Sequence, residues 1–338
     1  MQALSPICYV HFVIFFIVNC QFPLFTLPMS MLKEIILANP RGFCAGVVRA
    51  IATVRLALEQ YGPPIYVLHE IVHNKHVVQE LEKLGVVFMV ELADIPRGAV
   101  CIFSAHGVSV AVQQQAQIFG LRTIDATCPL VSSVHRMVEK YHAEGCEVLI
   151  IGHHRHPEVE GVAGRVVDRV HVIATEEEAE RVQVVDPQRV AYVTQTTLSQ
   201  SDIAGIRAKL EQRFPAIRGP RSNVCYATQN RQNVVKELAQ KTDILLVVGS
   251  KTSSNSNRLR EVGVRAGMTG YLIDDETDIH PEWLEGHASV GVTAGASAPE
   301  RLVRGVVQWL QEYGATVVTE LPGKEEQVSF QPAVLVNN

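Results

Sequence analysis

Three cysteines begin three copies of one pattern, and this repeat restricts the possible folds more than any other feature. Cys44, Cys128 and Cys225 each stand just before a stretch with apolar residues at helical spacing. Two polar loops follow each cysteine at nearly constant distances. The loops centre, unit by unit, on His73 and His106, on His156 and Thr196, and on Ser253 and Ser297. The repeat predicts three similar units around one shared site.

Short apolar runs alternate with the helical stretches in every unit. Ile65–Leu68, Val148–Ile151 and Ile244–Val248 each precede the first polar loop of their unit. Alternation of this kind is typical of βαβ units and parallel sheets. Ligands of such sheets bind beyond the carboxyl ends of the strands. Since every polar loop follows an apolar run, we expect all six loops to face a common centre.

These patterns predict an α/β fold of three pseudo-symmetric αβα modules, with mostly parallel sheets arranged around the central site. The modules are expected at residues 46–128, 129–221 and 222–321, and residues 32–45 add an N-terminal strand to the third. Residues 322–338 are polar and interrupted by proline, which indicates a loose C-terminal tail. The chain of 338 residues is 47% hydrophobic and 19% charged, as expected for a globular protein with a sizeable core.

Residues 1–30 form a hydrophobic extension of different character. The run from Ile7 to Leu27 is long enough to cross a bilayer, which takes about 20 apolar residues. It lacks the basic leader of a signal peptide and is interrupted by Pro23. Two interpretations remain open, a membrane anchor and an upstream start codon appended to a protein that begins at Met31. We favour the second and expect no membrane association.

Charge and cysteine usage exclude several classes. The net charge is −5 and no run of Lys or Arg forms a basic stripe, so nucleic acid is not an expected partner. Seven widely spaced cysteines do not suit a secreted disulfide scaffold and favour free thiols in the cytoplasm. Cys101 and Cys146 lie in or beside apolar runs and are expected in the core, while Cys8 and Cys20 belong to the extension.

The three repeated cysteines suit an iron–sulfur cluster. A thiolate is stabilised at a helix N-terminus, where all three are expected. The sequence has no CxxC pair, which disfavours a closed zinc finger. A [4Fe–4S] cluster normally takes four cysteines, so three would leave one iron open to a substrate oxygen. We predict one such cluster per chain.

The polar loops are rich in His, Ser and Asn beside glycine, a combination that binds phosphate or diphosphate. No GxxxxGK[ST] loop is present, so an NTP hydrolase is not indicated. The register favours His73, His106 and His156 over the other loop histidines. Glu158 is the carboxylate nearest to a register position. A dry site beside an anion would raise its pKa and suit it to proton delivery, while a surface position is the plain alternative.

Nine motifs, in order, resemble one enzyme family, 4-hydroxy-3-methylbut-2-enyl diphosphate reductase. The resemblance runs from about Met31 to about Phe330 and is carried by NPRGFCAGV (39–47), HEIVHN (69–74), FSAHGVS (103–109), DATCPLV (125–131), GHHRHPEVEG (152–161), TQTTLS (194–199), CYATQNRQ (225–232), VVGSKTSSNSNRL (247–259) and VTAGASAP (292–299). It implies reductive dehydroxylation of (E)-4-hydroxy-3-methylbut-2-enyl diphosphate to isopentenyl and dimethylallyl diphosphate. It also implies a three-lobed αβα protein around a [4Fe–4S] cluster.

The resemblance also implies roles for individual residues. Cys44, Cys128 and Cys225 correspond to the cluster ligands. Glu158 resembles the proton donor, and Thr196 the residue that orients the substrate hydroxyl. His156 is counted with them as catalytic. The implied substrate-binding set is His73, His106, His156, Gln195, Thr196, Ser253, Ser254, Asn255 and Ser297.

The sequence has no GxGxxG fingerprint for a nicotinamide or flavin cofactor. Electrons are therefore expected from a partner such as reduced ferredoxin or flavodoxin. Two other functions remain as alternatives. A non-catalytic iron–sulfur sensor or scaffold would need the cluster without the donor loops, and a zinc-dependent hydrolase would act on a phosphate ester.

Overall fold

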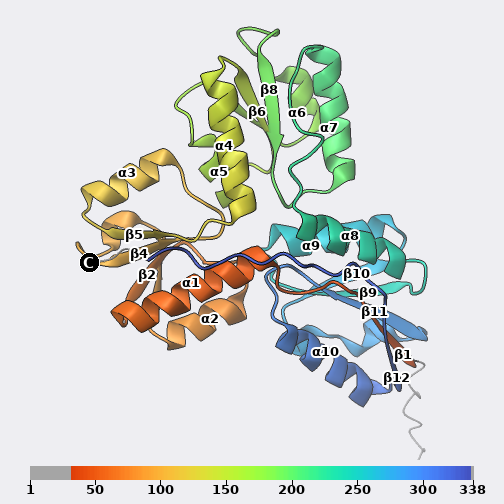
Figure 1. Ribbon diagram of the computed structural model, residues 1–338. Helices are drawn as coiled ribbons and strands as arrows, with labels where there is room; N and C mark the ends of the chain where they lie inside the picture. The colour runs from red at the N-terminus through yellow and green to blue at the C-terminus, as the bar shows by residue number, and fades with distance from the viewer. Residues whose placement is uncertain (1–31, 336–338) are drawn as a thin grey trace, which may run out of the picture.

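The computed structural model describes residues 32–335 as three α/β modules, each built on its own sheet (Figure 1). Every strand pairing in the three sheets is parallel. The predicted fold class is confirmed, whereas the expected module boundaries stay predictions. The prediction for residues 1–30 lies outside the described residues. Among residues 32–335, no helix has the length and apolarity needed to cross a membrane.

Module 1 is a four-stranded sheet in the order β3-β2-β4-β5. Apolar side chains of α1 and α2 pack on one face of the sheet, and those of α3 pack on the other. Its elements are α1 (Ala45–Tyr61), β2 (Ile65–Leu68), α2 (Lys75–Lys83), β3 (Val86–Met89), the 3-10 helix η1 (Leu92–Asp94), β4 (Val100–Phe103), α3 (Val110–Ile118) and β5 (Arg122–Asp125).

Module 2 is a three-stranded sheet in the order β7-β6-β8. Helices α4 and α5 cover one face, and α6 and α7 cover the other. Its elements are α4 (Pro129–Ala143), β6 (Glu147–Ile151), α5 (Pro157–Ala163), β7 (Val170–Ile173), α6 (Glu176–Arg181), β8 (Val190–Thr194) and α7 (Gln200–Arg213).

Module 3 is a five-stranded sheet in the order β10-β9-β11-β1-β12. The strand that opens the described chain, β1 (Glu34–Leu37), lies between β11 and β12. Helices α8 and α9 cover one face and α10 the other. The remaining elements are α8 (Tyr226–Leu238), β9 (Ile244–Val248), α9 (Ser254–Arg265), β10 (Thr269–Ile273), the 3-10 helices η2 (Glu276–Asp278) and η3 (Pro281–Leu284), β11 (Ser289–Ala294), α10 (Glu300–Tyr313) and β12 (Val317–Glu320).

The three repeated cysteines occupy equivalent positions in the fold. Cys44, Cys128 and Cys225 are the N-cap residues of α1, α4 and α8. Each of the six polar loops begins at the carboxyl end of a strand, namely β2, β4, β6, β8, β9 and β11. Figure 1 shows the three modules arranged around a common middle. The chain therefore brings three helix N-termini and six loops to the same part of the molecule.

The C-terminal segment is not the loose tail that its composition suggests. From the end of β12 to residue 335 it has neither helix nor strand, yet Figure 1 shows it, in dark blue, crossing the middle of the molecule alongside α1 to the neighbourhood of β4. Ala333 is buried in the core of module 1. Glu326 is only 14% exposed and pairs with Arg231 of α8. The segment thus connects modules 3 and 1, and the prediction of looseness is wrong because local composition does not reveal these distant contacts.

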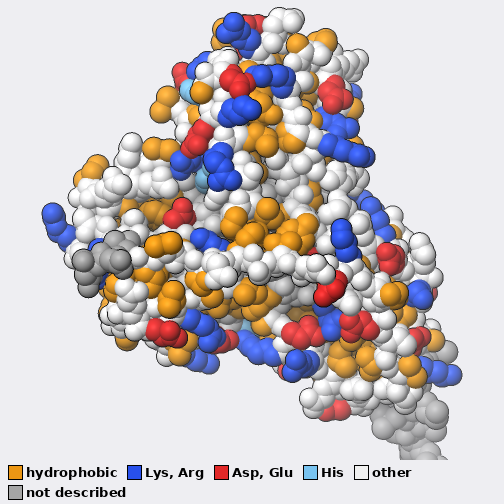
Figure 2. Space-filling view, viewed as in Figure 1, with side chains coloured by type: hydrophobic (Ala, Val, Ile, Leu, Met, Phe, Trp, Pro, Cys, Tyr) orange, Lys and Arg blue, Asp and Glu red, His pale blue; other side chains and the backbone are white. Residues whose placement is uncertain are grey.

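Apolar side chains gather in the middle of the face seen in Figure 2, where the modules of Figure 1 meet. Charged side chains of both signs lie mostly around this area. The junction of the modules is thus walled by apolar as well as polar groups.

Candidate active site

One cavity of about 110 Å³ lies where the three modules meet. It is lined by all three cysteines and by side chains from all six polar loops. The lining comprises Cys44, Gly46, Val47, Val72, His73, Ala105, His106, Cys128, Leu130, Val131, His156, Glu158, Thr196, Thr197, Cys225, Thr228, Ser253, Ser254, Asn255, Ala296 and Ser297. Of the site residues predicted from the sequence, Gln195 alone is not among them. Segments far apart in the chain therefore form one wall.

The three thiols are free and lie close enough to influence one another. Burial raises the pKa of Cys128 to about 12 and of Cys225 to about 11, and the charges of the neighbouring cysteines add to both shifts. A Cβ atom at Gly46 would lie 2.7 Å from the Cys128 sulfur and 3.8 Å from the Cys44 sulfur. Glycine therefore leaves the space that these two thiols need.

This donor set fits a group of several metal ions. The Cys128 and Cys225 thiols would be protonated on their own, so a positive group must compensate their ionised form. Within residues 32–335, no three His, Cys, Asp or Glu side chains form a site for a single ion. An iron–sulfur cluster spaces its ligands more widely than one ion does and is usually held by cysteine thiolates. Cys44, Cys128 and Cys225 match this requirement.

Three histidine rings form a cluster in the cavity wall. The ring centroid of His73 lies 4.3 Å from that of His106 and 6.0 Å from that of His156. Burial, and then the neighbouring histidines, lower the pKa of His106 well below its ordinary value. The same causes lower the pKa of His156 to about 4. Without a ligand, the His106 and His156 rings are therefore uncharged at neutral pH.

Hydrogen bonds orient two of these rings. The Glu158 amide donates to Nδ1 of His156, so the neutral His156 ring carries its proton on Nε2. Nδ1 of His73 lies 3.0 Å from a Glu70 carboxylate oxygen. Nε2 of both rings is buried and has no hydrogen-bond partner among residues 32–335. Unpartnered buried nitrogens are costly, and a bound anion would satisfy both.

Glu158 is the second residue of α5 and is only 3% exposed. Its carboxylate accepts hydrogen bonds from the Thr196 amide at 2.7 Å and the Thr196 hydroxyl at 2.8 Å. Burial raises the pKa of Glu158 to about 7, although the two bonds from Thr196 act in the opposite direction. The expected rise in pKa is confirmed, and the surface alternative is wrong. A carboxyl group with this pKa can give or take a proton near neutral pH.

Gln195 lies behind the cavity wall and supports it. Its amide nitrogen lies 2.8 Å from the Thr197 hydroxyl and 3.4 Å from the Ser254 hydroxyl. Its amide oxygen accepts from the His153 backbone. Gln195 therefore joins β8, the loop after β6 and the start of α9, and its position suits alignment of the lining rather than contact with a ligand.

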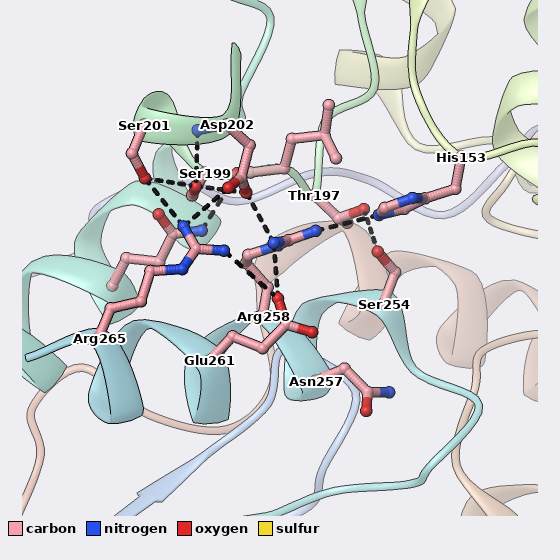
Figure 3. Close-up of polar contacts among 12 residues, drawn as sticks. His153, Thr197, Ser199, Ser201, Asp202, Ser254, Asn257, Arg258, Glu261 and Arg265 are labelled. Atoms are coloured by element: carbon pink, nitrogen blue, oxygen red, sulfur yellow. Dashed lines mark hydrogen bonds and ion pairs between the residues drawn. The ribbon is translucent and has the colours of Figure 1, made fainter. Parts of the chain in front are cut away.

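A charged network extends this support across modules 2 and 3 (Figure 3). Arg258 of α9 donates to the carboxylates of Asp202 and Glu261 at 2.7 and 2.6 Å. Its other terminal nitrogen lies 3.0 Å from Nε2 of His153. Figure 3 also shows the separate contact between the Thr197 and Ser254 hydroxyls at the cavity, to which the His153 backbone is joined through Gln195. Arg258 thus links α7, α9 and the loop that carries His156.

The cavity also contains residues that the sequence patterns did not single out. Thr228 lies one turn into α8, with its hydroxyl 3.1 Å from the Cys225 sulfur and 3.3 Å from the Asn255 amide nitrogen. Its position three residues after a helix-capping cysteine was the available signal. Val72, Leu130 and Val131 supply an apolar part of the wall that suits a hydrocarbon group.

Comparison with known proteins identifies the family. A sequence model of the family described as LytB protein matches residues 35–311. The chain belongs to the LytB family. It is an oxidoreductase, as the motifs predicted, and the sensor and zinc hydrolase alternatives are not supported.

Curated relatives and solved structures agree with this assignment. The chain is 62% identical over 304 residues to a 4-hydroxy-3-methylbut-2-enyl diphosphate reductase of Desulfotalea psychrophila, a match covering 90% of this chain and 97% of the relative. It is 54% identical over 299 residues to the enzyme of that name from Aromatoleum aromaticum, covering 88% and 96%. A solved reductase from Plasmodium falciparum has a TM-score of 0.85 at 36% identity, covering 89% of this chain and 96% of that one.

Proposed function

We propose that this protein removes the 4-hydroxyl group of (E)-4-hydroxy-3-methylbut-2-enyl diphosphate by reduction, giving isopentenyl and dimethylallyl diphosphate. The carbon–oxygen bond breaks and water leaves. Two electrons and two protons are consumed, with one proton taken by the departing hydroxyl and one by carbon. The names of the relatives and the contents of the cavity support this reaction.

The proposed cofactor is one [4Fe–4S] cluster, held by Cys44, Cys128 and Cys225. When bound, it would supply the electrons one at a time and a Lewis-acidic site for the substrate oxygen. The support is the presence of three free thiols, one per module, around a single cavity. Gly46 adds to it by leaving room beside two of the sulfurs.

The diphosphate is proposed to bind to the loops opposite the thiols. Nε2 of His156 is a fixed donor, and Nε2 of His73 is a second buried ring nitrogen without a partner among the described residues, available to the same anion. The N-terminus of α9, with Ser253, Ser254 and Asn255, adds hydroxyl and amide groups and a positive helix dipole. His106 and Ser297 complete the proposed set.

Glu158 is the observation that carries the proposal, because it is a buried carboxyl group in the same cavity as the thiols with a pKa of about 7. In its protonated form it can deliver a proton to the departing hydroxyl. Thr196 holds both carboxylate oxygens and can orient that hydroxyl. Exclusion of water by the surrounding wall strengthens these interactions.

The proposed electron donor is a reduced ferredoxin or flavodoxin, and the proposed location is the cytoplasm. Thiol ligands and soluble electron carriers both operate under the reducing conditions found there. The decisive experiment is anaerobic purification, measurement of iron and sulfide per chain, and an assay of the allylic diphosphate with a chemical electron donor. Absence of sulfide, or of turnover by an iron-replete protein, would contradict the proposal.

Replacing Glu158 by Gln tests the proton-transfer step. The variant keeps the size and the bonds to Thr196 but cannot release a proton to the substrate, so turnover should fall by about 10²- to 10⁴-fold. Iron content and substrate binding should persist. Glu160→Gln, an exposed neighbour in α5, is the matched control. Steady-state turnover of Glu158→Gln equal to that of the control would remove Glu158 from the mechanism.

A further inference from the structure

A buried cation outside the cavity joins three segments of the chain. Arg231 lies in α8, the helix that begins after Cys225, and its side chain is 1% exposed. Nε and Nη2 of Arg231 both donate to the Gly42 carbonyl, at 3.1 and 2.7 Å. Nη1 donates to the Ala227 carbonyl at 2.9 Å. The guanidinium group therefore connects helix α8 to the loop between β1 and α1, which ends at Cys44 and is called the Cys44 loop below.

The C-terminal segment supplies the counter-charge. Glu326 accepts from Nη1 of Arg231 at 3.0 and 3.3 Å and from Nη2 at 3.3 Å. Asn230 donates a further bond to Glu326 at 3.1 Å. Removing one partner of a buried ion pair leaves an uncompensated charge, which is strongly unfavourable. Glu326 therefore keeps the guanidinium group in place.

The main chain that leads into Cys44 is bonded on two sides, and Arg231 supplies the second. The Gly42 amide donates to the Ala294 carbonyl and the Cys44 amide to the Ala296 carbonyl, each at 3.1 Å. These bonds tie one side of the loop to the end of β11. Arg231 ties the other side to α8. The separation of the Cys44 and Cys225 thiols is thus set through a side chain that contacts neither sulfur.

Other residues of the C-terminal segment also contact the chain on either side of Cys44. Gly323 packs so closely on the backbone of Asn39 that no larger residue fits. Farther along, the Ala333 amide donates to the Thr53 hydroxyl in α1 at 2.9 Å. Since α1 begins directly after Cys44, the segment is attached before and after this cysteine.

We infer that residues 322–335, acting through the Glu326–Arg231 pair, form a clamp that positions Cys44 and Cys225 for the cofactor. Arg231 and Glu326 are positioning residues, because they act through the Cys44 loop and touch neither the cavity nor a ligand. The importance of the clamp for cofactor retention rests on the proposed function. Its effect on the Cys44 loop does not, and both can be measured separately.

Hydrogen exchange of the metal-free protein tests the clamp itself. In Glu326→Gln the carboxylate charge that balances Arg231 is lost. Amides between residues 40 and 47 should therefore exchange about tenfold faster than in the wild type. Amides of β6, in module 2, serve as the internal reference and should be unchanged. Glu325→Gln is the matched control, because Glu325 is exposed and its carboxylate accepts a hydrogen bond from the nearby Gln327 side chain.

Two results would overturn the inference. Unchanged exchange at residues 40–47 in Glu326→Gln would mean that the pair does not hold the loop. Equal acceleration in β6 would mean that the pair supports the whole fold and not the loop. If Glu326→Gln does not fold, Glu326→Asp is compared under the same two criteria, since it keeps the charge and shortens the reach.

Cofactor retention is then measured in anaerobically reconstituted protein with a ferrous chelator. Glu326→Gln should release iron about tenfold faster than wild type and Glu325→Gln. Equal release rates would overturn the role in cofactor positioning. A wild-type protein that takes up no iron and sulfide would instead refute the proposed function, while the exchange result would still stand.

Discussion

At the scale of single residues, the cavity combines groups whose protonation is changed by burial in opposite directions. Burial keeps a proton on Glu158 and on the Cys128 and Cys225 thiols, and it removes the proton from His106 and His156. All these shifts reduce charge in the cavity when no ligand compensates it. The site is thus suited to ligands that bring charge with them, such as a diphosphate and a metal cluster.

The pKa of Glu158 predicts a contribution to the pH dependence of stability. The folded value is about 7 and the ordinary value 4.5, so the folded state binds this proton more tightly. The stabilisation is present below pH 4.5 and is lost as the pH rises through about 7. Relative to Glu158→Gln, the metal-free wild type should lose on the order of 3 kcal/mol of unfolding free energy over this range. Denaturant titrations at several pH values would measure this loss. Unfolding free energies of wild type and Glu158→Gln that change in parallel with pH would contradict the prediction.

Gly46 predicts a steric limit on the thiol side of the cavity. In Gly46→Ala the new Cβ would lie 2.7 Å from the Cys128 sulfur, so this thiol must move. Alanine favours the helix, and the fold should therefore persist. Metal affinity should fall by roughly tenfold or more. Iron analysis beside circular dichroism measures both effects, with the exposed Val48→Ala as the control. Full iron content in Gly46→Ala would refute the limit.

At the scale of helices and strands, the site depends on where elements begin. The three cysteines cap α1, α4 and α8, and His156 and Ser253 cap α5 and α9. A capping residue is fixed by the first turn that follows it. The side chains of Cys225, His156 and Ser253 accept hydrogen bonds from the first turns of their helices, whereas those of Cys44 and Cys128 make no such bond. The helices therefore orient three of the five side chains directly.

Arg258 predicts that contact between α9 and module 2 affects substrate binding. In Arg258→Met the link from α9 to Asp202 and His153 is lost, so Ser254 and Thr197 lose alignment. KM should rise about tenfold with a smaller change in kcat. Arg265→Met is the control, because Arg265 is 47% exposed and contacts the same acidic groups from outside. Similar KM values for the two variants would show that the link is unimportant.

Much of the fold could be predicted at this scale, because most buried strands are uniformly apolar and lie between clear helices. Strands β5 and β12 were not predicted. Ile124 is the one apolar residue in the sequence of β5, and β12 is exposed along its whole length. Both lie at sheet edges, where burial no longer imposes an apolar pattern.

The register residues, which are the three cysteines with His73, His106, His156, Thr196, Ser253 and Ser297, could be predicted because they repeat, and the cavity brings them all together. The resemblance added Gln195, Ser254 and Asn255, of which Gln195 lies outside the cavity lining. Residues outside the register, such as Thr228, were not found. The same holds for the Glu326–Arg231 pair, whose members are far apart in sequence. Such contacts leave no local pattern in a single sequence.

At the scale of the whole molecule, most of each apolar core lies away from the proposed cofactor site, although Val47 and Val72 of the module 1 core also line the cavity. Each module packs its helices against its own sheet, and these apolar clusters provide most of the buried surface. The thiols are N-caps at the inner ends of three helices. Folding should therefore not require the metal.

Metal removal tests this separation. The metal-free protein should keep its far-ultraviolet circular dichroism at room temperature, because the three cores remain. Its thermal midpoint should fall by several degrees, since a ligand that binds only the folded state stabilises it. Anaerobic melting of chelated and reconstituted samples measures both quantities. Loss of the dichroism signal on chelation would show that the metal is needed for folding.

The parallel strands of all three sheets direct their carboxyl ends to one meeting point, so each module supplies only part of the active site. A separated module would carry one sulfur, two loops and no enclosed space. Activity is therefore indivisible in this chain. A mutation that slightly tilts one module moves its cysteine and both its loops at once. Such a mutation should lower activity more than its distance from the cavity would suggest.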